Sequence, residues 1–161
     1  MKRLKYILLA FAVLYLFFRL SLVIFRLPSY TIKTSGKLYV ISKKSEDIQV
    51  IDLSSGKEIA EIPIDILSHE IVTTADEKSV VYTNYESNDG NAIKVINAKN
   101  NQFEKTIPLD RNIKVNGIAA THNPNEVAVI DYANNNLLVI NIKTNRIERR
   151  ISTKQKKSHL L

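Results

Sequence analysis

Apolar residues along the chain fall into short runs that recur at a nearly constant spacing. The tripeptide Val50–Asp52 recurs as Val95–Asn97 and again as Val139–Asn141, at spacings of 45 and 44 residues. The same offsets superpose one isoleucine and one turn-forming residue of each copy: Ile62, Ile107 and Ile151, and Gly56, Asn101 and Asn145. Agreement in so many columns indicates an internal repeat with three copies.

The second and third strands of each copy are predicted from their apolar runs. The second strands are nearly continuous in apolar residues, which predicts burial of both faces. They span residues 38–41, 80–83 and 127–130. The third strands are centred on residues 48–51, 93–96 and 137–140. Each is followed by the Gly or Asn of the shared column, and both residue types tolerate the left-handed backbone of a tight hairpin.

The fourth and first strands have a different character. The fourth strands interleave charged and apolar residues, which suits a sheet edge in contact with solvent. They span residues 58–62, 103–107 and 147–151. The first strands have the weakest pattern and are placed at residues 30–34, 69–74 and 116–121. Each copy therefore predicts one four-stranded antiparallel unit.

Units of four strands and 40–45 residues with two buried faces are typical of the blades of a β-propeller. The predicted fold is all-β, with blades at about residues 30–64, 69–108 and 115–152 inside a domain that spans 28–153. A closed ring has four to eight blades. Three blades therefore predict self-association or a protein partner that completes the ring, or else a truncated piece of a longer propeller.

Several segments of the repeat resemble the YVTN-type β-propeller repeat of surface-layer proteins and lactonase-like propellers. They are residues 38–40, 81–84, 48–63 and 115–120. The resemblance covers residues 30–152 and implies the propeller fold, but it leaves the function open because propellers host many functions. The family's Pro-Asp-Gly turn before the second strand is replaced by Ala75–Glu77 and Asn123–Asn125.

The N-terminal segment predicts a membrane anchor at residues 1–27. A cationic head, Met1–Lys5, precedes Tyr6–Phe25, which is apolar except for Arg19 and Ser21 and is long enough to cross a bilayer as a helix. The charge bias places the N-terminus in the cytoplasm and the β domain outside it. The alternatives are export after cleavage of a signal peptide, for which no small-x-small site follows the apolar run, and a buried core helix.

The net charge of +7 arises at the two ends of the chain. Residues 1–26 contain five basic and no acidic side chains, and the tail 154–161, expected to be flexible, contains three lysines and no acid. The β domain between them is nearly neutral. The basic balance therefore does not indicate nucleic-acid binding.

Few residues offer a pattern that could carry catalysis or bind a metal. The chain has no cysteine, and its histidines, His69, His122 and His159, share no repeat column and no metal-ligand spacing. The repeated polar column of Asp52, Asn97 and Asn141 could form a ring of calcium ligands, but an acceptor that opens a hairpin turn is the preferred interpretation. Among the tyrosines, Tyr39 and Tyr82 are expected in the core, and Tyr85 and Tyr132 at exposed strand ends.

These observations predict a membrane-anchored, extracytoplasmic binding or interaction module with no catalytic residues, no cofactor and no metal. The alternatives are a fragment of a lactonase-like or cofactor-binding propeller enzyme, or a truncated product without independent function. If the chain is an enzyme, its site should lie near the first strands, at His69, Glu70 and Asn116.

Overall fold

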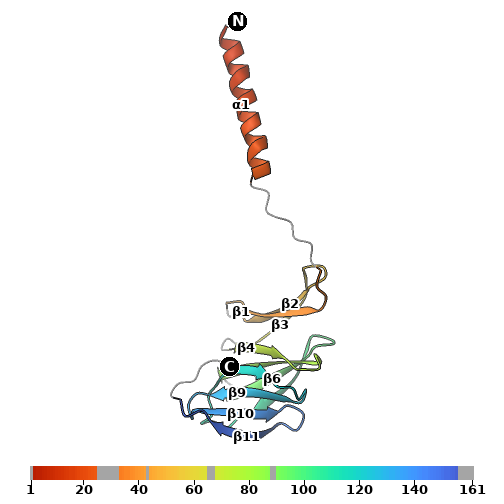
Figure 1. Ribbon diagram of the computed structural model, residues 1–161, viewed down its shortest axis with the longest axis vertical. Helices are drawn as coiled ribbons and strands as arrows, with labels where there is room; N and C mark the ends of the chain where they lie inside the picture. Colours follow the sequence, from red (N-terminus) through yellow and green to blue (C-terminus); the bar gives the residue numbers. More distant parts are fainter. Residues whose placement is uncertain (1, 25–32, 43, 65–67, 88–89, 156–161) are drawn as a thin grey trace. The chain divides into compact units, whose positions relative to one another are not determined.

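The computed structural model describes residues 2–24, 33–42, 44–64, 68–87 and 90–155 (Figure 1). The chain divides into two units, Met1–Lys33 and Thr34–Leu161. The predicted basic tail, 154–161, lies outside the described residues except for Lys154 and Gln155.

The first unit contains helix α1 (Lys2–Ile24). Within the part of this helix that the structure describes in full, no stretch is long and apolar enough to cross a membrane. The described residues therefore do not support the predicted transmembrane anchor.

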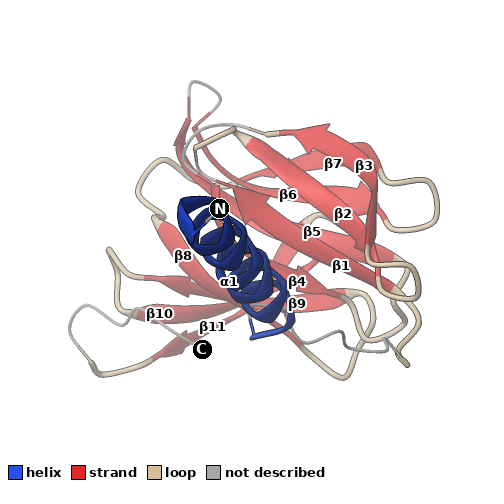
Figure 2. Ribbon diagram, turned by 90° about the horizontal axis from the view of Figure 1, so that it is seen from above, coloured by secondary structure: helices blue, strands red, loops and turns tan. Residues whose placement is uncertain are grey.

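The second unit is built from antiparallel strands in three sheets (Figure 2). The first blade consists of β1 (Lys37–Ser42), β2 (Asp47–Asp52) and β3 (Lys57–Pro63). The second consists of β4 (Ser68–Thr73), β5 (Ser79–Ser87), β6 (Gly90–Asn97) and β7 (Gln102–Pro108). The third consists of β8 (Val115–Ala120), β9 (Glu126–Asp131), β10 (Asn136–Asn141) and β11 (Arg146–Ser152).

Strand order within each sheet follows the chain, so each blade is a meander with its last strand at an edge. The predicted edge position of the charged fourth strands is confirmed by β3, β7 and β11. The predicted first strand at residues 30–34 is not observed. Residues 30–32 lie outside the described part of the chain, and Lys33 and Thr34 are not in a strand. The structure therefore describes three strands of the first blade, and the fourth expected strand lies largely outside the described residues.

The blades repeat in register as well as in sequence. Val50 pairs with Ala60, Val95 with Lys105, and Val139 with Arg149. Directly after each of these pairs the register shifts by a β-bulge, at the same place in all three blades. The turn column also repeats, since Gly56, Asn101 and Asn145 have φ of 66°, 57° and 59°. The predicted left-handed turns are confirmed.

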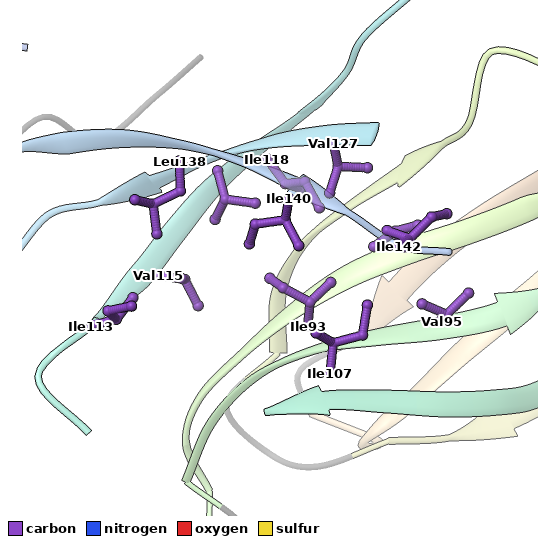
Figure 3. Close-up of a cluster of buried hydrophobic side chains, with 12 residues drawn as sticks. Ile93, Val95, Ile107, Ile113, Val115, Ile118, Val127, Leu138, Ile140 and Ile142 are labelled. Atoms are coloured by element: carbon purple, nitrogen blue, oxygen red, sulfur yellow. The ribbon is translucent and has the colours of Figure 1, made fainter. Parts of the chain in front are cut away.

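Successive blades pack face to face through two hydrophobic clusters. We call the face that packs on the next blade along the chain the forward face, and the opposite face the backward face. The forward face of the first blade packs Ile48, Val50 and Ile62 against Val80, Tyr82 and Ile96 on the backward face of the second. The forward face of the second blade packs Val81, Ile93, Val95 and Ile107 against Val127, Leu138 and Ile140 on the backward face of the third (Figure 3).

Burial of both faces of the second strands is confirmed for β5 and is wrong for β1. In β5, Val80 packs on the first blade, while Val81 packs towards the third. In β1, Tyr39 packs on the second blade, whereas Leu38 and Val40 remain exposed. The difference has a simple cause, because no described sheet covers the backward face of the first blade.

Candidate functional site

The polar column that follows each third strand serves the hairpin turns. The carboxylate of Asp52 accepts hydrogen bonds from the Ser55 backbone amide and from the Ser54 and Ser55 hydroxyls, at 2.6–2.7 Å. The side-chain oxygen of Asn97 accepts from the Lys99 amide, and that of Asn141 from the Lys143 and Thr144 amides, at 2.9–3.0 Å. This confirms the interpretation of the column as a turn acceptor.

The hydrogen bonds of this turn also lower the pKa of the Asp52 carboxyl. Donors from Ser54 and then Ser55 hold the pKa of the Asp52 carboxyl at about 2, below its ordinary value of 3.8. Within the part of the chain that the structure describes, no group of three or more His, Asp or Glu side chains is placed so that it could hold a metal ion.

The residues proposed for an enzymatic site lie at bulges in the inner strands of the second and third blades. The pairing of β4 with β5 shifts between Ser68 and Ile71, and that of β8 with β9 shifts between Val115 and Ile118. His69 and Glu70 fall in the first bulge and Asn116 in the second. A bulge leaves backbone groups without a ladder partner, so these positions need other hydrogen bonds.

Side chains of the second blade supply those hydrogen bonds to the third. The Ile118 amide donates to Glu70 Oε2 at 3.1 Å. The Thr83 hydroxyl donates to the Asn116 carbonyl, also at 3.1 Å. We call the packed boundary between the first and second blades the first seam, and that between the second and third blades the second seam. The structure thus brings Glu70 and the Asn116 backbone together at the second seam. In each of the two hydrogen bonds a side chain of the second blade contacts a backbone group of the third. The side chain of His69 lies outside the described residues.

The other residues singled out from the sequence are dispersed. His122 is exposed in a turn, and His159 lies outside the described residues. Tyr82 is buried and Tyr39 is half-buried at the first seam, as predicted. Burial raises the pKa of the Tyr39 hydroxyl. Tyr132 is half-buried where exposure was expected, and the side chain of Tyr85 lies outside the described residues.

The most distinctive surface is the backward face of the first blade. Leu38 is 46% exposed, whereas Val80 and Val127 in the same repeat column are fully buried. Val40 is 37% exposed, although the equivalent Tyr82 and Val129 are buried. Apolar side chains that are core residues in the second and third blades are therefore surface residues in the first.

The forward face of the third blade shows the same effect at Ile151 and Leu137. Ile151 is 45% exposed, whereas its equivalents Ile62 and Ile107 are 6% and 1% exposed. Leu137, the equivalent of the buried Ile48 and Ile93, is half-buried. Two other side chains of this face, Ile130 in β9 and Val139 in β10, are buried. We call these two surfaces the open backward face and the open forward face.

A cation from the forward face reaches the next blade at both seams inside the chain. At the first seam, Lys37 Nζ donates to the Ala98 carbonyl at 2.6 Å and to Asn101 Oδ1 at 2.9 Å. The Tyr39 hydroxyl also donates to Asn101 Oδ1, at 2.9 Å. At the second seam, Lys105 Nζ donates to the carbonyl of Ile142, which occupies the same repeat column as Ala98. The sequence reasoning missed these lysines, because a lysine in a strand carries no sign of its acceptor.

The arrangement of the strands is shared with solved propeller structures. Hydrazine synthase of Kuenenia stuttgartiensis is similar with a TM-score of 0.66 and 18% identity, over 77% of this chain and 34% of the other. The chain is a set of β-propeller blades.

Two further propellers give the same result at similar identity. The dihydro-heme d1 dehydrogenase NirN matches with a TM-score of 0.59 and 16% identity, over 83% of this chain and 29% of its own. The WD40 repeats of RRP9 match with a TM-score of 0.62 and 16% identity, over 82% of this chain and 39% of theirs. The chain thus spans between about three tenths and two fifths of the length of these propeller chains. No family model matches the sequence, and no curated protein matches it either.

Proposed function

We propose that this protein is a non-catalytic, propeller-type interaction module that binds protein through the open backward face and the open forward face. The observation that carries the proposal is the contrast within repeat columns. Leu38 and Ile151 are about half exposed, while their equivalents inside the array are buried. Exposed apolar patches of this kind mark sites of protein interaction.

The proposal of a non-catalytic role draws support from the inner strands. Glu70, the carboxylate first considered for acid–base chemistry, accepts a backbone amide across a blade seam. A carboxylate engaged in this way stabilises the packing of the blades. We further propose that the blades belong to the YVTN-type repeat, on the sequence segments that resemble it.

We also propose, from the apolar segment and its charge bias, that the N-terminal segment holds the β domain at a membrane outside the cytoplasm. Carbonate extraction and protease accessibility of cell fractions test this part separately. Extraction into the soluble fraction, or protection of the β domain in intact spheroplasts, would contradict it.

Site-specific photo-cross-linking tests the interaction faces. The full chain is produced with a photoreactive phenylalanine at Leu38 or at Ile151, and, as a control, at Lys99, which is exposed in the turn between β6 and β7. We expect discrete protein adducts from the first two positions and none from the third. A charge on the same face, Val40→Asp, should abolish the adduct formed at position 38. Absence of adducts at both faces would overturn the proposal.

A further inference from the structure

We infer that the occupant of the two open faces is a second copy of this chain, docked head to tail so that the open forward face meets the open backward face. The inference rests on the proposed function and names its partner. It follows because the two open faces carry the same repeat columns as the faces that pack together at the two seams inside the chain.

Every seam inside the chain joins the same two surfaces. The forward columns of the first and second blades pack on the backward columns of the second and third. The third blade carries the forward columns again, with Leu137, Val139 and Ile151. The first blade carries the backward columns, with Leu38, Val40 and Ile51. A forward face of one copy and a backward face of another therefore repeat a seam that the fold already contains.

The cation of the second seam has a counterpart on the open forward face, whereas the first-seam cation Lys37 has Glu126 as its equivalent there. Lys105 pairs with Val95 in the sheet and reaches the Ile142 carbonyl of the next blade. Arg149 pairs with Val139 and so occupies the position of Lys105. The residue equivalent to Ile142 on the first blade is Leu53. The geometry therefore directs the Arg149 guanidinium of one copy to the Leu53 carbonyl of the other.

Charges on the two open faces are compatible with this contact. Glu58 and Glu61 pair with Ile51 and Gln49, so they lie on the open backward face, and both are exposed. Arg149 is exposed on the open forward face, where it forms an ion pair with Glu126 at 3.7 Å. Docking brings Arg149 towards the acidic side chains of Glu58 and Glu61 on the open backward face.

Symmetry makes two copies a closed assembly. Each copy offers one forward and one backward open face, and three sheets are described in each. Two copies joined by two equivalent seams give a ring of six blades, within the range of four to eight that closed propellers adopt. A head-to-tail contact that fails to close would instead extend into a filament.

Cysteine cross-linking tests the seam directly, since the native chain has no cysteine. Ile107 lines one small groove with Ile140 and Ile147 at the second seam. The equivalent positions between copies are Ile151 on one chain and Ile51 and Glu58 on the other. Full-length Ile151→Cys chain and Glu58→Cys chain are mixed in mild detergent. They are then treated with an oxidant or with a short bis-maleimide, which tolerates imperfect thiol geometry.

We expect a covalent two-copy product from the mixture and from neither variant alone. The matched control replaces Glu58→Cys by Lys99→Cys in an exposed turn, and should give no product. A chain that carries both Ile151→Cys and Glu58→Cys should stop at two copies. Equal product with the control, or no product in the mixture, would overturn the second-copy inference. A ladder of larger products would overturn the six-blade ring.

Arg149 provides an independent readout. Arg149→Ala should slow cross-linking about tenfold, and Arg149→Lys should restore it, because lysine makes the equivalent contact at the second seam. An unchanged rate with Arg149→Ala would contradict the assigned contact. Photo-adducts to a different protein at positions 38 and 151, without cross-links between copies, would retain the interaction faces and reject the second copy. Absence of both would reject the proposed function itself.

Discussion

Asn101 and Asn145 occupy the same position in two hairpins, yet their side chains make different contacts. Both adopt the left-handed conformation, with φ of 57° and 59°. Asn101 also accepts hydrogen bonds from Lys37 and Tyr39 of the preceding blade. The turn requirement could be read from the sequence because Gly56 shares the column. The seam contact could not, because its donors lie more than 60 residues away.

Replacing each asparagine by glycine separates the two roles. Glycine adopts this backbone conformation at least as easily, so Asn145→Gly should change the free energy of unfolding by less than about 0.5 kcal/mol. Asn101→Gly should lower it by about 1–2 kcal/mol, because two seam hydrogen bonds lose their acceptor. Urea unfolding followed by circular dichroism measures both. Equal effects of the two substitutions would contradict the seam role of Asn101.

The depressed pKa of Asp52 links a turn to acid stability. A carboxyl whose pKa is lower in the folded state contributes stability that is complete above its unfolded pKa, near 3.8. That contribution is lost as the pH falls towards about 2. Asp52→Asn keeps an acceptor, as Asn97 and Asn141 do, but it cannot titrate. The difference in unfolding midpoint between wild type and Asp52→Asn should be constant from pH 5 to 7. Between about pH 4 and 2 the midpoint of the wild type should fall relative to that of Asp52→Asn. A difference independent of pH would contradict the assignment.

At the scale of the strands, the sequence pattern predicted twelve strands, and eleven of them are observed at nearly the predicted positions. Hydrophobic runs and turn residues act within a few positions of the chain, so both leave a local signal. The burial of the first blade could not be predicted in this way. Leu38 and Val80 carry the same kind of apolar pattern, and their different exposure depends on whether another sheet covers that face.

One repeat column tests this account of the blade faces. Ile107 is 1% exposed at the second seam and Ile151 is 45% exposed on the open forward face. Ile107→Ala should lower the free energy of unfolding by about 2–4 kcal/mol, because a buried cavity remains. Ile151→Ala, measured on dilute protein, should lower it by less than about 1 kcal/mol. Thermal and urea unfolding give both values. A cost for Ile151→Ala as large as that for Ile107→Ala would show that the forward face is already covered within one chain.

At the scale of the whole molecule, the candidate site is a property of the repeat and not of any motif. The sequence predicted either a partner that completes the ring or a truncated propeller, and it named His69, Glu70 and Asn116 for the alternative enzymatic site. The structure places the Glu70 side chain and the Asn116 backbone at a seam between blades. The surfaces that favour a partner emerge only from a comparison of exposure along repeat columns, because each apolar residue on them looks like a core residue in the sequence.

The mass of the assembled full chain is the most direct test of the interaction faces. Native mass spectrometry from mild detergent should show a species of twice the 18.3 kDa chain mass. Ile151→Asp should convert it to single chains, because an unpaired charge would be buried at the seam. Lys99→Asp, in an exposed turn, should leave it intact. A single chain mass for the wild type, or a two-copy species that survives Ile151→Asp, would contradict the head-to-tail assembly.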